Sequence, residues 1–181
     1  MKAVIDTSAL ISLGCAEILK KSAELLECSL PSEVHSEIRE LSKYDDAEGN
    51  AASRVLDMIS EGKLIQLVIA HKENAEALIS ADVQHGEASC FVLCVERKIS
   101  LLIMDDIDAS FALSNKAHVQ GIRMRISVAV AVELCRQGRI SKSQLKTVVG
   151  KLIKQRRWEG GVLEVLAHKY LDDLQRQHTP L

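Results

Sequence analysis

Residues 2–8 read KAVIDTS, and residues 99–106 read ISLLIMDD. In each stretch a short, mostly apolar run is followed by an acidic residue, Asp6 in the first and the pair Asp105 and Asp106 in the second. Apolar runs of this length are typical of strands that are buried on both faces of a parallel sheet. The carboxyl ends of parallel strands meet at one edge, where the functional sites of such folds gather. The two stretches therefore predict a parallel α/β fold with acidic residues at one sheet edge.

The rest of the chain continues this alternation of short apolar runs and helical patterns. We expect strands over 2–5, 26–30, 64–69, 99–104 and 122–126. We expect helices over 9–13, 16–26, 31–41, 51–60, 73–80, 86–97, 107–117, 127–137, 141–155 and 160–175, with a polar loop over 42–50. Strands that alternate with helices in this way are typical of a parallel sheet covered on both faces.

Composition favours one folded domain over 1–181. The chain has 181 residues, 47% of them hydrophobic, and a net charge of −2, which argues against disorder. Two prolines and nine glycines are few for a turn-rich all-β fold. Only 3% of the residues are aromatic, which disfavours a module that stacks single-stranded bases on aromatic side chains.

The five cysteines and the first residues favour a cytoplasmic protein with reduced thiols. The cysteine count is odd, and Asp6 stands where a signal peptide would have its apolar core. No apolar run approaches the ~20 residues that span a bilayer. Cys90 and Cys94 share a helix face but lack a second ligand pair, so we interpret them as buried small side chains and not as zinc ligands.

Five carboxylates fall where this fold would gather them: Asp6, Glu37, Glu87, Asp105 and Asp106. Each has a structural interpretation when taken alone, as a helix cap, a first-turn acid or a solvated helix residue. Carboxylates that converge on one pocket raise each other's pKa, and a divalent cation removes that conflict. Oxygen ligands alone suit Mg²⁺ or Mn²⁺, which can activate water for phosphodiester hydrolysis.

The order of these pieces resembles the PIN domain, the nuclease fold of VapBC-type toxins. The matching segments are VIDTS at 4–8, LP at 30–31, VHSEI at 34–38, GEA at 86–88, LLIMDD at 101–106 and GIRMRI at 121–126. The likeness covers about residues 1–135. It implies a three-layer α/β/α sandwich with a mostly parallel central sheet of about five strands. It also implies a Mg²⁺- or Mn²⁺-dependent ribonuclease.

Carried over by motif, the resemblance implies catalytic roles for Asp6, Glu37, Glu87 and Asp106. The same residues would bind the metal, with Asp105 as a rival for the last place because the two carboxylates are adjacent. Ser8 would support the metal or its waters. The resemblance further implies an RNA substrate, a homodimer and a cognate antitoxin.

The helical extension at about 139–181 departs from the compact toxins. It makes the chain more similar to a less characterised PIN subgroup, which weakens the toxin role more than the fold.

A basic stretch follows the last expected strand. Between positions 123 and 157 there are ten basic residues and one acidic residue. Arg123, Arg125, Lys142 and Lys146 are candidates for binding a phosphate backbone. A solvated helix face, or a surface that docks an acidic partner segment, is the competing interpretation. His85 precedes its helix and could approach the site, although no catalytic histidine is predicted.

Two functions compete. The first is metal-dependent endoribonuclease activity, with the protein acting as the toxin of a toxin–antitoxin pair. The second is non-catalytic binding of protein or nucleic acid by the same fold, with the carboxylates as caps. A phosphotransfer domain fits less well, because the first strand lacks the paired acids of a receiver. The chain has no glycine-rich phosphate loop, which disfavours a nucleotide-binding fold.

Overall fold

The computed structural model describes residues 1–176, which form a five-stranded sheet flanked by helices. The strands are β1 (Lys2–Ile5), β2 (Glu27–Pro31), β3 (Ile65–Leu67), β4 (Leu101–Ile103) and β5 (Arg123–Arg125). They are arranged in the order β3-β2-β1-β4-β5, and every neighbouring pair is parallel. The predicted α/β sandwich with a five-stranded sheet is confirmed, and the sheet is parallel throughout.

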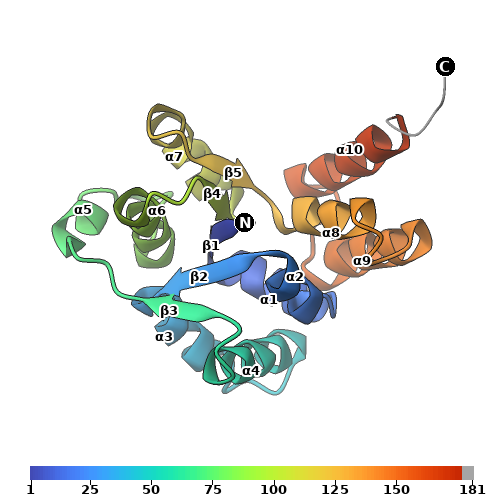
Figure 1. The fold of residues 1–181 in the computed structure, drawn as a ribbon, viewed down its shortest axis with the longest axis horizontal. Coiled ribbons are helices and arrows are strands. Elements are labelled where there is room, and N and C mark those ends of the chain that lie inside the picture. Colours follow the sequence, from blue (N-terminus) through green and yellow to red (C-terminus); the bar gives the residue numbers. More distant parts are fainter. Residues whose placement is uncertain (177–181) are drawn as a thin grey trace.

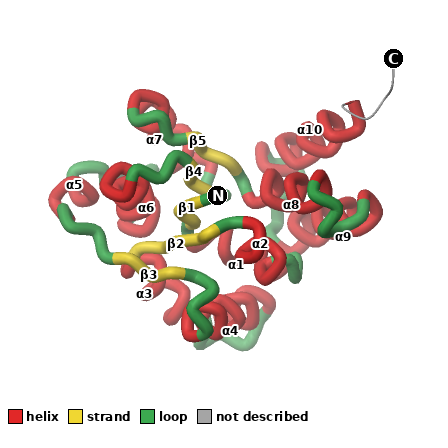
Figure 2. Tube along the Cα trace, viewed as in Figure 1, coloured by secondary structure: helices red, strands yellow, loops and turns green. Residues whose placement is uncertain are grey.

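Ten helices connect and cover these strands in the described part of the chain. They are α1 (Thr7–Cys15), α2 (Leu19–Leu25), α3 (Ser32–Leu41), α4 (Ala47–Ser60), α5 (Lys72–Glu76), α6 (His85–Arg97), α7 (Ile107–Val119), α8 (Ser127–Arg136), α9 (Lys142–Gln155) and α10 (Val162–Arg176). Figure 1 shows α5, α6 and α7 on one side of the sheet and α1, α4, α8 and α9 on the other. Figure 2 shows the short strands as a band between these two helical layers.

The two central strands are buried on both faces, as their continuous apolar sequences predict. Val4, Ile5, Leu102 and Ile103 have 1% or less of their surface exposed. Removing this much apolar surface from water is the main driving force for the sandwich. Because β1 and β4 are neighbours, the residues that follow them are brought side by side at one edge of the sheet.

Several predicted boundaries differ from the structure by one to four residues, and two of these differences involve an aspartate cap. The predicted loop over 42–50 is shorter, because Asp46 caps α4 by accepting a hydrogen bond from the Gly49 N–H at 2.8 Å. Helix α1 begins at Thr7 and not at residue 9, because Asp6 caps it. A polar composition alone cannot distinguish a loop from a capped first turn.

Both edge strands are short, and the backbone of β5 is partly covered. The Arg123 N–H donates to Ser100 O, and Arg125 O accepts from the Met104 N–H, both at 2.9 Å. Since these groups face β4, the peptide groups of Met124 point to the open edge. The Arg125 guanidinium donates to Met124 O at 2.8 Å and covers that carbonyl.

The C-terminal helices complete the core on the α1 side of the sheet. Leu145, Leu152 and Trp158 are buried there. Lys151 pairs with Glu17 at 2.8 Å, and Arg156 forms an ion pair with Glu48. The segment beyond residue 139 is therefore packed against the sheet-bearing part of the chain, and α9 contacts α1 directly.

All five cysteines are free thiols, and Cys90 and Cys94 are buried as predicted. Among the described residues, no helix is both long enough and apolar enough to cross a membrane.

Gly14 tests how tightly α1 and α4 pack, and Gly150 in α9 is its control. A Cβ added at Gly14 would lie 2.8 Å from the Ala51 Cβ, whereas one added at Gly150 in α9 would have nothing within 4 Å. We expect Gly14→Ala to lower the free energy of unfolding by about 1–3 kcal/mol through overpacking. Gly150→Ala should raise it by about 0.5–1 kcal/mol, because alanine favours a helix interior. Urea unfolding followed by circular dichroism measures both, and equal effects would contradict the close packing.

Candidate functional site

Asp6 leaves β1 at the carboxyl edge of the sheet and is both a helix cap and a buried acid. Its Oδ1 accepts from the Ala9 N–H at 2.9 Å, and the Ser8 hydroxyl lies 2.9 Å from Oδ2. Only 2% of the residue is exposed. Burial raises the pKa of Asp6 well above its usual value, and the negative charges of Asp105 and Glu87 raise it further. The amide of Ala9 and the hydroxyl of Ser8 oppose this effect.

Asp105 leaves β4 beside Asp6 and is tied to it through Ser8. The Asp105 N–H donates to the Ser8 hydroxyl oxygen at 2.9 Å, so Ser8 contacts both acidic residues. The Ser127 N–H, at the start of α8, donates to Asp105 Oδ1 at 2.7 Å. Burial raises the pKa of Asp105. The hydroxyls of Ser12 and Ser127 lie close enough to oppose this shift, although Oδ2 is buried and has no hydrogen bond of good geometry within the described residues.

Glu37 reaches the same edge from α3 and lies against the first turn of α6. The Thr7 hydroxyl donates to its Oε2. A Cβ at Gly86 would lie 2.6 Å from Glu37 Oε1, so glycine at this position gives the carboxylate its room. Burial raises the pKa of Glu37, and Glu87 raises it further, while the Thr7 hydroxyl and His85 oppose the shift.

Glu87 lies in the first turn of α6 and closes that helix end. Its Oε2 accepts from the Gln84 N–H at 2.9 Å, and together the two residues form a capping box. The side chain is half-buried. Because its charge raises the pKa of both Asp6 and Glu37, Glu87 lies within electrostatic reach of both.

The four carboxylates thus share one environment, the N-terminal ends of α1, α6 and α8. Asp6 accepts from a backbone amide of α1, and Asp105 accepts from one of α8. Glu87 caps α6, and Glu37 packs against the same turn. Helix N-termini carry unpaired N–H groups and partial positive charge, which favour negative groups. The partial positive charge of these helix N-termini offsets the repulsion between the neighbouring carboxylates.

A family model of the PIN domain matches residues 2–167. The chain belongs to the PIN domain family. Members of this family are typically nucleases and usually depend on a metal. The match extends past residue 135 and includes α9 and the start of α10. Among curated proteins and among solved structures, nothing matches this chain.

In this PIN domain the two adjacent aspartates have different environments. Asp105 is buried beside Asp6, whereas Asp106 is the N-cap of α7 and is only half-buried. Asp106 Oδ1 accepts from the Ala109 N–H at 2.8 Å. The structure therefore places Asp105 beside Asp6, which also feels the charge of Glu87, and places the carboxylate of Asp106 at the N-terminus of α7. His85 is the first residue of α6 and is exposed.

The candidate basic residues are distributed over two other places. Arg123 and Arg125 line a cavity between β5, α8 and α10. Lys142 and Lys146 are exposed on α9. Four further members of the basic stretch form ion pairs with glutamates, namely Arg136, Arg139, Lys151 and Arg156. These pairs account for part of the stretch as ordinary helix surface.

Sequence reasoning missed Thr7, Gly86 and Ser127 as parts of the site. Thr7 is adjacent to Asp6, and Gly86 precedes Glu87, so both lay within the segments already singled out. Ser127 follows the last strand, and a residue opening a helix at a carboxyl strand end is a signal that could have found it. Its partner Asp105 lies 22 positions earlier, a contact that only the fold reveals.

The donor set suits a divalent cation, although the ligands are not pre-assembled. Carboxylate oxygens are the donors that Mg²⁺ and Mn²⁺ prefer. The orphaned Oδ2 of Asp105 supplies a buried acceptor that a cation would satisfy. Among the described residues, no three acidic, histidine or cysteine side chains converge closely enough to hold an ion as they stand. Ion binding therefore requires a side-chain rearrangement, for which half-buried Glu37 and Glu87 are suited.

The buried acids predict how stability depends on pH. Folding raises the pKa of Asp6 and Asp105, so the folded state holds more protons than the unfolded chain above the usual carboxyl range. The free energy of unfolding should therefore fall as pH rises from about 4 through the raised pKa values. Asp6→Asn keeps a good capping residue and removes one ionisation. Without divalent ions, we expect this variant to be more stable than the wild type at pH 7 and to have a flatter profile.

Urea unfolding between pH 4 and pH 8 tests this prediction. Asp106→Asn is the matched control, because it makes the same change at another helix N-cap of this PIN domain. A wild-type profile that rises with pH over this window, or parallel profiles for wild type and Asp6→Asn, would contradict it.

Proposed function

We propose that this PIN domain hydrolyses RNA phosphodiester bonds in a metal-dependent reaction at the edge where β1 and β4 end. The supporting observation is the burial of Asp6 and Asp105 side by side at helix N-termini, with one carboxylate oxygen left without a partner. Burying two acids is unfavourable unless something positive completes their environment. A polar pair kept at such an energetic disadvantage is a candidate functional site.

Asp6 and Asp105 would hold a Mg²⁺ or Mn²⁺ ion, with Glu87 completing the ligand set and Glu37 left for the proton transfer. Bound there, such an ion supplies an activated water and stabilises negative charge on the phosphate. Ser8 orients both aspartates, since its hydroxyl contacts the Asp6 carboxylate and the Asp105 amide. Ser127 fixes one oxygen of Asp105, which leaves the other for the ion.

Glu37 is the residue we propose as proton acceptor for the attacking water. Thr7 holds its Oε2, so Oε1 is the atom available to take the proton. Burial raises its pKa, which makes its carboxylate a stronger base than an exposed glutamate. The negative charge of Glu87 also raises the pKa of Glu37, so Glu37 would lose its proton at a higher pH than an exposed glutamate does.

The alternative is a non-catalytic binding domain in which the carboxylates are caps. One observation favours it: no three ligands converge within the part of the chain that the structure describes. Asp6, Glu87 and Asp106 all cap helices, as that interpretation requires. Metal binding separates the two functions. The RNA surface at Arg123, Arg125, Lys142 and Lys146, the antitoxin and the homodimer stay predictions.

Mn²⁺ binding is the first measurement. We expect calorimetry to detect a saturable site in the wild type, and Asp6→Asn and Asp105→Asn to weaken it by about 10–100-fold or more, the loss seen when groups around a metal are removed. Asp106→Asn should bind as the wild type does. Circular dichroism verifies that each variant is folded. Equal binding by all three variants would contradict the proposed ligand set.

Cleavage of a fluorescent RNA in the presence of Mn²⁺ is the second measurement. We expect Asp6→Asn and Glu37→Gln to lower the rate by about 10²–10⁴-fold, the contribution of a positioned acid or base. Asp105→Asn should be equally impaired, and Asp106→Asn should retain activity. Full activity in folded Asp6→Asn would overturn the nuclease proposal. Loss in Asp106→Asn with retention in Asp105→Asn would reassign the fourth residue.

A further inference from the structure

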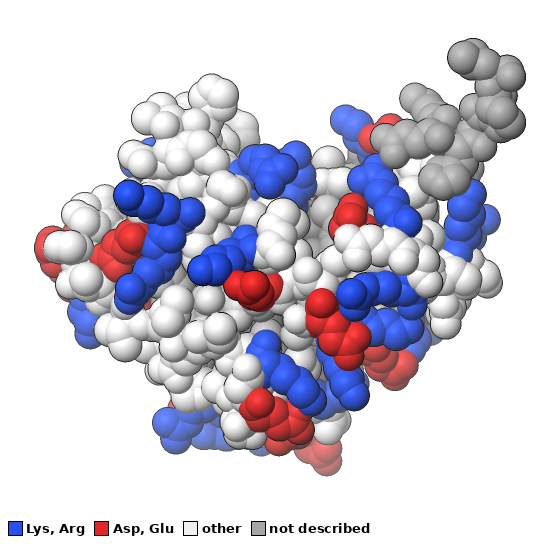
Figure 3. Space-filling model, viewed as in Figure 1, with Lys and Arg blue, Asp and Glu red and all other residues white. Residues whose placement is uncertain are grey.

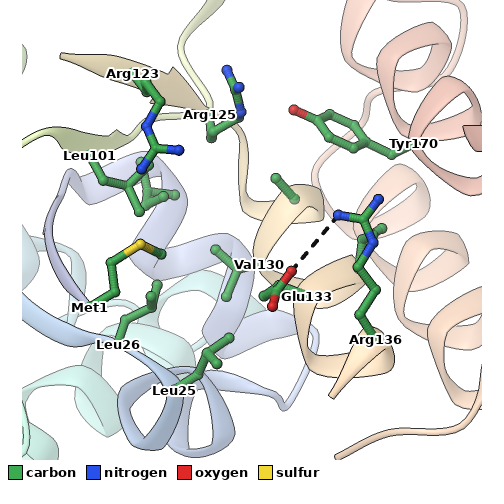
Figure 4. A pocket seen from close by; sticks show the side chains of 13 residues that line it. Met1, Leu25, Leu26, Leu101, Arg123, Arg125, Val130, Glu133, Arg136 and Tyr170 are labelled. Atoms are coloured by element: carbon green, nitrogen blue, oxygen red, sulfur yellow. Dashed lines mark ion pairs between the residues drawn. The ribbon is translucent and has the colours of Figure 1, made fainter. Parts of the chain in front are cut away.

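A cavity of about 270 Å³ lies between the sheet and the C-terminal helices, away from the acidic site. Its lining includes Met1 and Leu26, which directly precede β1 and β2. The cavity runs along β4 and β5 and reaches the amino ends of β1 and β2, whereas Asp6 and Asp105 follow the carboxyl ends of β1 and β4. Figure 4 shows the cavity bounded by β5 on one side and by α8 and α10 on the other.

The floor of this cavity is aliphatic. Leu101 and Ile103 of β4, Leu26, and Val130 of α8 line it. Figure 4 shows Leu101, Leu26 and Val130 directed toward a common space. A floor of branched aliphatic side chains favours an apolar body and offers no hydrogen bonds.

The rim of the cavity is basic. Arg123 and Arg125 project from β5, and Tyr170 of α10 faces them across the opening (Figure 4). The lining acid, Glu133, lies 3.8 Å from Arg136, so its charge is offset within the pair. None of the hydrogen bonds or ion pairs among the described residues engages the guanidinium of Arg123. The rim therefore carries an excess of positive charge.

Tyr170 adds a hydroxyl donor to this rim. The side chain is half-buried, and burial raises the pKa of its hydroxyl while the nearby Arg125 charge lowers it. The hydroxyl therefore keeps its proton at neutral pH and can donate it in a hydrogen bond.

Figure 3 shows Lys and Arg side chains bordering the recess between α7 and the C-terminal helices.

We propose that this cavity binds a small amphiphilic anion, an organic carboxylate with a short aliphatic chain. The carboxylate would lie between Arg123 and Arg125, since guanidinium groups bind carboxylates by charge-assisted hydrogen bonds. The aliphatic body would cover Leu26, Leu101, Ile103 and Val130. The volume is below the ~300–1,000 Å³ of sites for drug-sized ligands, so the occupant is small.

A small anion fits the cavity better than an RNA strand does. An aliphatic floor lacks the stacking platforms that hold unpaired bases. The carboxylates of the proposed nuclease site, Asp6, Glu37, Glu87 and Asp105, are not among the residues that line the cavity. The site is independent of the proposed nuclease activity, and it can be tested without metal or RNA.

Octanoate is the probe for this site, titrated into the full chain by calorimetry. We expect saturable binding at one site per chain. 1-Octanol, which lacks the charge, and inorganic phosphate, which lacks the chain, should each bind at least about tenfold more weakly, because each loses one of the two contacts. Arg123→Gln and Arg125→Gln should each weaken octanoate binding about tenfold or more, the effect of losing a charged hydrogen bond.

Lys154→Gln is the control variant, since it removes one exposed positive charge on α9. It should bind octanoate within about twofold of the wild type, because surface charges far apart interact weakly at physiological salt. Circular dichroism verifies the fold of all variants. Absence of saturable binding, equal binding of octanoate and phosphate, or unchanged affinity in both arginine variants would overturn the proposal. Displacement of octanoate by a short single-stranded RNA would also overturn it and assign the surface to nucleic acid.

Discussion

Two aspartates buried side by side constrain much of this structure. Asp6 and Asp105 follow neighbouring parallel strands at the carboxyl end of the sheet. Each accepts a hydrogen bond from a backbone amide at a helix N-terminus. Charge buried in this way is tolerable only with such donors. The β1–α1 and β5–α8 connections must therefore end close together, which in turn places α8 and the helices after it on the α1 side of the sheet. The acidic edge and the C-terminal packing are parts of one arrangement.

The capping role and the site role of these carboxylates are compatible. A cap uses one oxygen of a carboxylate: Oδ1 of Asp6 serves α1, and Oε2 of Glu87 serves α6. The cap also fixes the position of the side chain. At Asp6 the remaining oxygen therefore lies on a rigid support, whereas the side chains of Glu37 and Glu87 have to move before an ion can be bound. At Asp6 and Glu87 the helix cap and the proposed metal contact therefore use different oxygen atoms. Both roles nevertheless depend on the negative charge of the same carboxylate.

Much of the fold could be predicted because its signals are local. The runs at 3–5 and 101–103 are apolar throughout, which is the pattern of doubly buried parallel strands. The start of α4 was missed because its cap, Asp46, lies in a polar segment with the composition of a loop. The different environments of Asp105 and Asp106 could not be predicted from sequence, since Asp105 is held by Ser8 and Ser127, which are 97 and 22 positions away along the chain. The same limit hid the role of Gly86, whose missing side chain matters only because α3 brings Glu37 against it.

The covered edge of β5 also bears on how the protein behaves when it is concentrated. A parallel sheet has two edges, and an exposed edge is a template onto which another chain can add a strand. Here each edge strand has only three residues, and Arg125 occupies the outward carbonyl of Met124. Charged side chains and short edges are the devices by which natural sheets resist growth into fibres. The folded chain should therefore stay dispersed at concentrations at which a longer, uncharged edge would seed aggregation.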